Sequence, residues 1–107
     1  MEDKRFEISA LLDLYGSLLS ERRRDVLELY YNADLSLAEI AQETGITRQG
    51  ARDAIEKGKR ALFFYEEGLG FAEKTRRVKA LAAEIKEAAV KSGCKTVLAL
   101  AEQLAEL

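Results

Sequence analysis

The segment SLAEIAQETGIT, residues 36–47, places signals for the start and the end of helices within one short stretch. Ser36 and Glu39 have the spacing of a capping box, in which each side chain accepts a hydrogen bond from the backbone N–H of the other residue. Gly45 can adopt the left-handed conformation that ends a helix, and Thr47 is a suitable N-cap for a second helix. The segment therefore predicts a short helix, a tight turn and a second helix over about residues 47–67, with the two helices crossing at a steep angle.

The residues on both sides of this segment predict an all-α protein. The chain of 107 residues is rich in Ala, Leu, Glu, Lys and Arg and has no segment with the alternating β-branched residues that are typical of strands. Residues 6–20 predict an amphipathic helix that ends near Gly16, and Ser20 is a potential cap for a helix over residues 21–33. The apolar residues of these two helices are Phe6, Leu11, Leu12, Leu14, Tyr15, Leu18, Leu19, Val26, Leu27, Leu29, Tyr30 and Tyr31.

Gly68 and Gly70 mark a boundary between residues 1–70, the predicted helix-turn-helix domain, and a C-terminal helical extension over residues 71–107. The extension contains an amphipathic helix that ends at Gly93 and a shorter helix for which Thr96 is a potential cap. The residues expected to face inward are Val78, Leu81, Ala82, Ile85, Ala88 and Ala89 in the first helix and Val97, Leu100, Ala101, Leu104 and Leu107 in the second. We expect the extension to pack on the core or to mediate homodimerisation.

The residue types also limit the chemistry of the chain. It has no His and a single Cys, Cys94, so the usual zinc ligands, the usual general base near neutral pH and the Ser/His/Asp arrangement are missing. We expect no enzymatic activity, no cofactor and no metal. The N-terminal residues lack the apolar core of a signal peptide, and no run approaches the roughly 20 apolar residues that span a bilayer. We therefore expect a cytoplasmic protein without membrane insertion.

Basic residues gather on the predicted second helix. Its first two turns place Thr47, Arg48, Gln49 and Arg52 where a recognition helix faces the major groove. Arginine makes bidentate hydrogen bonds to guanine and glutamine to adenine, while Lys57, Lys59 and Arg60 could contact phosphates. With Ser36, at the start of the preceding helix, these eight residues are the candidate nucleic-acid contacts. The same pattern also fits a purely structural helical corner, and the net charge of −2 weakens nonspecific affinity for DNA.

Two other basic groups allow two interpretations. Arg22, Arg23 and Arg24 stand at the start of the helix over residues 21–33, and a cluster at the start of the C-terminal extension contains Lys74, Arg76, Arg77 and Lys79. Each group is either a solvated face or a contact for an anionic partner, RNA or phosphate in the case of the cluster.

Residues 18–62, LLSERRRDVLELYYNADLSLAEIAQETGITRQGARDAIEKGKRAL, resemble region 4 of bacterial sigma factors. The preceding LLDLYGSLLS and the following YEEGLGF make the chain more closely similar to the YlxM family, and this similarity extends over about residues 6–71. The sequence departs from the sigma pattern at Gly50 and Ala51, where a small helix former and then a valine are usual, and at Ala54, where a larger side chain is common.

The resemblance implies a small, stand-alone helix-turn-helix protein that binds DNA and is linked to the signal recognition particle pathway. We therefore expect a non-enzymatic regulator of transcription that forms a homodimer and binds nucleic acid, with DNA favoured over RNA. The alternative is an interaction protein that uses the same scaffold to bind RNA or protein of the secretion-targeting machinery, including components of the signal recognition particle.

Overall fold

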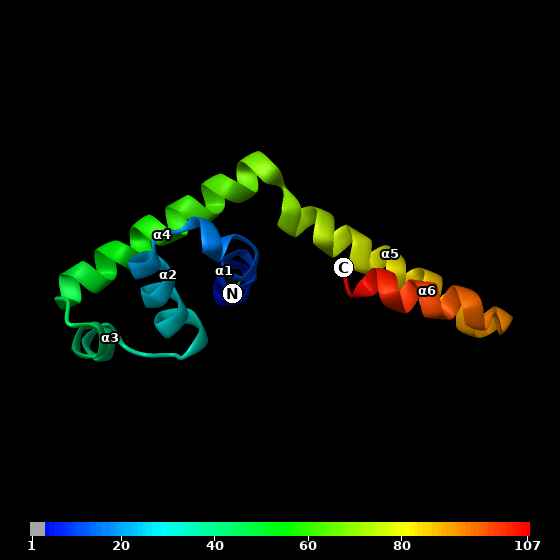
Figure 1. Ribbon diagram of the computed structural model, residues 1–107, viewed down its shortest axis with the longest axis horizontal. Helices are drawn as coiled ribbons and strands as arrows, with labels where there is room; N and C mark the ends of the chain where they lie inside the picture. The colour runs from blue at the N-terminus through cyan, green and yellow to red at the C-terminus, as the bar shows by residue number, and fades with distance from the viewer. Residues whose placement is uncertain (1–3) are drawn as a thin grey trace. The chain divides into compact units, whose positions relative to one another are not determined.

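The computed structural model describes residues 4–107, and it confirms the all-α fold class (Figure 1). These residues contain no strand. The α-helices are α1 (Lys4–Tyr15), α2 (Glu21–Leu27), α3 (Leu37–Thr44), α4 (Arg48–Leu69), α5 (Phe71–Ser92) and α6 (Lys95–Ala105). A 3₁₀ turn, η1 (Gly16–Leu18), follows α1, and a π-helical segment, η2 (Glu28–Asn32), follows α2. None of the helices in this part of the chain has both the length and the apolarity to cross a bilayer.

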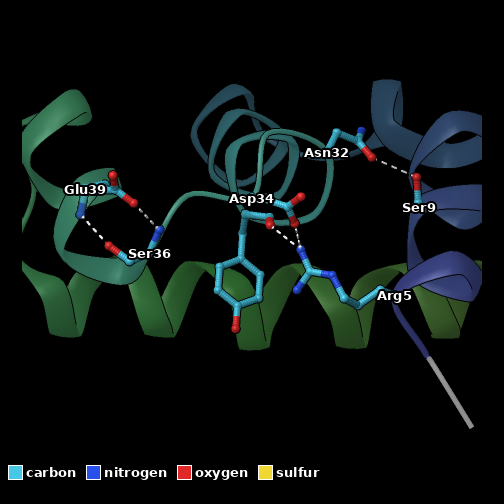
Figure 2. A network of polar contacts seen from close by, with 7 residues as sticks. Arg5, Ser9, Asn32, Asp34, Ser36 and Glu39 are labelled. Carbon is cyan, nitrogen blue, oxygen red and sulfur yellow. Dashed lines mark hydrogen bonds and ion pairs between the residues drawn. The ribbon is translucent and has the colours of Figure 1, made fainter.

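The predicted capping signals operate at the starts of α2 and α3. The backbone N–H of Arg23 donates to Ser20 Oγ at 3.3 Å. Both bonds of the capping box are formed, because the N–H of Ser36 donates to Glu39 Oε1 (2.8 Å) and the N–H of Glu39 donates to Ser36 Oγ (3.1 Å) (Figure 2). At the other end of α3, Gly45 has the left-handed conformation (φ 75°). These bonds satisfy backbone groups that a helix leaves unpaired at its ends.

Two predicted helix ends are wrong. Gly68 lies within α4, and only Gly70 (φ 66°) ends the helix, because one helical glycine costs only about 1 kcal/mol relative to alanine. The last helix begins directly after Cys94, whose side chain makes no capping hydrogen bond, so Thr96 lies inside α6 and is not its cap. The left-handed Gly93 (φ 72°) reverses the chain so sharply that the next helix starts two residues later.

The predicted helix over residues 21–33 is also not uniform, since it changes to the π form at Glu28. There the N–H of Ala33 donates to the carbonyl oxygen of Glu28 at 3.1 Å, five residues back. A side-chain bond holds this segment against α1, because Ser9 Oγ donates to Asn32 Oδ1 at 2.8 Å (Figure 2). Within the segment, Asn32 Nδ2 also donates to Glu28 Oε1. The π segment therefore reflects contacts with α1 that lie outside the local sequence pattern.

The chain divides into two compact units, one that ends at Gly70 and one that comprises Phe71–Leu107. In the first unit α4 packs against α1, α2 and α3. The core consists of the apolar side chains Ile8, Leu11, Leu12, Tyr15, Leu19, Val26, Leu27, Ile40, Ala51, Ile55 and Leu62. Phe6, Leu14 and Leu18 belong to the apolar pattern but are exposed, because α1 and the turn after it bury only one narrow stripe of side chains.

In the second unit α5 and α6 pack side by side as a hairpin (Figure 1). Small residues line their contact: Ala82, Ala89 and Ala101 are buried. The prediction that the larger residues face inward is wrong for Leu81, Ile85, Val97, Leu100 and Leu107, all of which are exposed, and Ala88 is exposed as well. Two helices that meet through alanines approach closely, and the larger apolar side chains then remain on the flanks of the contact.

Candidate nucleic-acid interface

The N-terminal end of α4 lies beside α3, as in a helix-turn-helix (Figure 1). The N–H of Gly50 donates to Thr47 Oγ1 at 2.9 Å, which confirms the predicted cap. Ile40 on α3 and Ala51 and Ile55 on α4 are buried where the two helices meet. The inner side of α4 is therefore anchored in the core, and its outer side is free to face a partner.

Arg48, Gln49 and Arg52 are all exposed on the first two turns of α4. Neither arginine forms an ion pair or a hydrogen bond with another side chain of residues 4–107. Gln49 differs, because its Nε2 donates to Asp53 Oδ1 at 3.0 Å. This bond was not predicted from the sequence, although Gln and Asp four residues apart on a helix are a recognised signal for it.

Thr47 and Ser36 are exposed residues whose hydroxyl oxygens already serve as helix caps. Each hydroxyl can still donate its proton, because a cap uses only its acceptor side. Ser36, however, stands beside the Glu39 carboxylate. Hydrogen bonds from the backbone N–H and then the side chain of Ser36 lower the pKa of Glu39 from its ordinary value, which already leaves this carboxyl group negatively charged at neutral pH. An anionic partner is therefore less favoured at Ser36 than at Thr47.

The three further basic residues do not share one surface. Lys57 and Arg60 are exposed on the outer side of α4, whereas Lys59 is half-buried and lies 3.5 Å from Glu56 Oε1. Two residues along an α-helix correspond to a rotation of about 200° around its axis. The side chains of Lys57 and Lys59 therefore point in nearly opposite directions. The structure therefore leaves Arg48, Arg52, Lys57 and Arg60 exposed, whereas Lys59, which shares its side of α4 with Arg48 and Arg52 about two to three turns farther along, is half-buried.

Comparison with known proteins places this sequence among the proteins of one family. The family model of UPF0122, the YlxM / p13-like helix-turn-helix proteins, matches residues 2–100. The UPF0122 protein of Clostridium kluyveri is 46% identical over 76 residues, which cover 71% of this chain and 68% of the relative. That of Clostridium botulinum is 49% identical over 77 residues (72% and 70%), and that of Caldanaerobacter subterraneus is 40% identical over 87 residues (81% and 74%).

Proposed function

This chain belongs to the UPF0122 family of YlxM / p13-like helix-turn-helix proteins, and from that premise we propose that it is a non-enzymatic, cytoplasmic regulator that binds duplex DNA through α4. Arg48 and Arg52 contact bases in the major groove, and Lys57, Arg60 and Thr47 contact phosphates. The observation that carries this proposal is the pair of exposed arginines without side-chain partners on the outer side of a capped helix with a buried inner side.

Arg48 and Arg52 are better suited to contact bases than Gln49 is. An arginine that is not held by a carboxylate can offer both arms of its guanidinium to guanine, and each such contact contributes about 1–3 kcal/mol of discrimination. Gln49 gives up its bond to Asp53 if it reads adenine, so its contribution is smaller. The capped first turn keeps the backbone of these residues in place, which lowers the entropy lost on binding.

The experiment is selection from a pool of random duplex DNA and from structured RNA, at two salt concentrations. Arg48→Ala/Arg52→Ala is compared with Lys91→Ala/Lys95→Ala, which removes the same charge from exposed positions on the second unit. We expect one DNA motif to be enriched, and the arginine variant to lose at least about tenfold in affinity for it. The lysine control should keep that affinity. If no motif is enriched, or if both variants bind alike, the proposal is wrong.

A second candidate function rests on the start of α5. Lys74, Arg77 and Lys79 are exposed there and form no ion pair within residues 4–107. In this alternative they bind RNA or protein of the secretion-targeting machinery, such as components of the signal recognition particle. Enrichment of structured RNA that Lys74→Ala/Arg77→Ala/Lys79→Ala abolishes, with no DNA motif, would favour this function over DNA binding.

We further propose that the protein forms a homodimer through one flank of the α5–α6 hairpin. One flank, the polar flank, carries the charged residues Lys79, Lys86, Glu102 and Glu106, which line a groove together with four alanines. Lys86 Nζ lies 3.8 Å from Glu102 Oε2 there. Helical geometry places Leu81 and Ile85 of α5 and Val97 and Leu100 of α6 together on the other flank, where their exposed fractions are 55%, 40%, 39% and 58%.

A second copy is the partner that suits this apolar flank. A two-fold axis pairs the flank with itself, so apolar side chains meet apolar side chains without any further sequence requirement. Two copies would also supply two recognition helices for paired half-sites on DNA.

A further inference from the structure

The first unit contains a cleft that the proposed DNA contact does not use. It has a volume of about 290 Å³ and lies where α1, η2 and α4 meet. Lys4 and Arg5 of α1, Tyr30 and Tyr31 of η2, and Lys59 and Phe63 of α4 line it. The volume is at the lower end of the range of about 300–1,000 Å³ that is usual for small-molecule sites.

The aromatic wall of the cleft is held in place by Arg5. Arg5 Nη2 donates to the carbonyl oxygen of Tyr30 at 2.7 Å and to Asp34 Oδ1 at 2.6 Å (Figure 2). Its guanidinium carbon lies 5.3 Å from the ring centre of Tyr30 and 5.2 Å from that of Tyr31, within the range of a cation–π contact. The two rings are edge to face, with centres 4.9 Å apart. The tyrosines are therefore fixed before any ligand arrives.

Positive charge prevails among the side chains that line the cleft. Lys4, Arg5 and Lys59 contribute three cations, and among residues 4–107 no carboxylate belongs to the lining. Asp34 pairs with Arg5 and Glu56 approaches Lys59 from outside, whereas Lys4 has no ion pair within residues 4–107. Burial raises the pKa of the Tyr31 phenol above its ordinary value, while the charge of Lys59 acts in the opposite direction. The phenol thus stays neutral beside a lysine and can donate a hydrogen bond.

We propose that this cleft binds a nucleotide, with Lys4 and Lys59 at the phosphate and the rings of Tyr31 and Phe63 against the base. Lysine ammonium groups bind phosphate as point charges. Aromatic side chains accept any base by stacking, which contributes about 1–3 kcal/mol per base. Phe63 is 38% exposed, so part of its ring is available. The ligand is either a free nucleotide or one nucleotide of a single strand, since both carry this chemistry.

The proposal is independent of base reading by Arg48 and Arg52. Lys59 lies eleven residues after Arg48 in α4, which corresponds to about 16 Å along a helix axis. Lys59 lines the cleft, whereas Lys57 and Arg60 are not among its lining residues. If no DNA motif is selected, the proposed nucleotide site can therefore still be correct. If the cleft binds no nucleotide, the proposed DNA contact can still be correct.

The test is a titration of the ¹⁵N-labelled full chain, followed by NMR, with inorganic phosphate, AMP and a six-nucleotide single-stranded RNA. We expect saturable shifts at Tyr30, Tyr31 and Phe63 with AMP, and at least tenfold weaker binding for Lys4→Gln/Lys59→Gln. Lys91→Gln/Lys95→Gln, which removes equal charge from the second unit, should bind as the unaltered chain does. If AMP binds more tightly than the RNA, the ligand of the cleft is a free nucleotide. If the RNA binds more tightly, the ligand is a single strand.

Phe63→Ala separates the two halves of the proposed contact. It should weaken the binding of AMP and leave the weak binding of inorganic phosphate unchanged, because only the base contacts the ring. This variant replaces an exposed side chain, so its fold is checked simply by its circular dichroism. The proposal is overturned if none of the three probes gives saturable shifts at the cleft, if Lys4→Gln/Lys59→Gln binds AMP as well as the control does, or if Phe63→Ala changes nothing.

Discussion

Among single residues, Gly58 shows how a residue that weakens a helix can be required by packing. It lies on the buried side of α4, against α2. A Cβ at this position would lie 2.6 Å from Leu27 Cδ1 and 3.2 Å from Leu27 Cγ, and Leu27 is completely buried. The leucine therefore has no space into which it can move. The absence of a side chain at Gly58 allows α2 and α4 to approach closely.

Gly58→Ala should destabilise the protein by about 1–3 kcal/mol, because overpacking of a closed core outweighs the better helix propensity of alanine. Gly68 is the matched control, since it lies in the same helix and a Cβ there would meet nothing within 4 Å. Gly68→Ala should stabilise by about 0.5–1 kcal/mol. Urea denaturation of the two variants measures both effects. Equal midpoints for the two variants would contradict the packing argument.

Among the helices, α3 is the one whose start is best defined by local bonds. The capping box between Ser36 and Glu39 joins residues three positions apart, and it fixes the direction in which α3 enters the helix-turn-helix. Because Glu39 is bonded in its ionised form, its pKa in the folded protein is below its ordinary value of 4.5. Such a group stabilises the fold above its unfolded pKa, and this contribution is lost as the pH falls through the lower, folded pKa.

Ser36→Ala should raise the pKa of Glu39 toward its ordinary value without reaching it, since the backbone N–H of residue 36 can still donate to the carboxylate. NMR titration of the Glu39 side-chain carboxyl group measures this pKa directly. Thr47→Ala is the control, because it removes the cap of the neighbouring helix α4 and leaves the capping box intact. A Glu39 pKa that is the same in the Ser36 variant and the unaltered chain would exclude the Ser36 side chain as a cause of the lowered pKa.

At the scale of the whole molecule, the two units differ in what they bury. The first unit buries leucines, isoleucines and a tyrosine among four helices, whereas the hairpin of α5 and α6 buries alanines and leaves its larger apolar residues exposed. Association of two hairpins through the apolar flank would bury these exposed residues.

Light scattering after size-exclusion chromatography should therefore give twice the chain mass of 12.0 kDa. Leu81→Glu/Leu100→Glu should reduce the mass to that of one chain, because the apolar flank would then carry charges that repel across the two-fold axis. Ala83→Glu places a charge at an exposed position on the polar flank of the same hairpin and should leave the dimer intact. A single-chain mass for the unaltered protein at micromolar concentration would refute the dimer.

The sequence by itself determined the local features of this fold. The caps at Ser20, Ser36 and Thr47 and the turn at Gly45 could be predicted, because each depends on hydrogen bonds between residues three or four positions apart. The all-α class and the helix-turn-helix follow from these signals together with the apolar periodicity.

Only the tertiary structure decided which side of each helix meets a neighbour. It brings Lys59 and Tyr31 to one cleft, it exposes Leu81 and Leu100, and it makes Gly58 necessary. None of these features follows from residue spacing, since a periodic pattern defines an apolar side of a helix without saying which part of that side another helix will cover. The physical reason is that burial depends on the distance between elements, and that distance is set by side chains far apart in the chain.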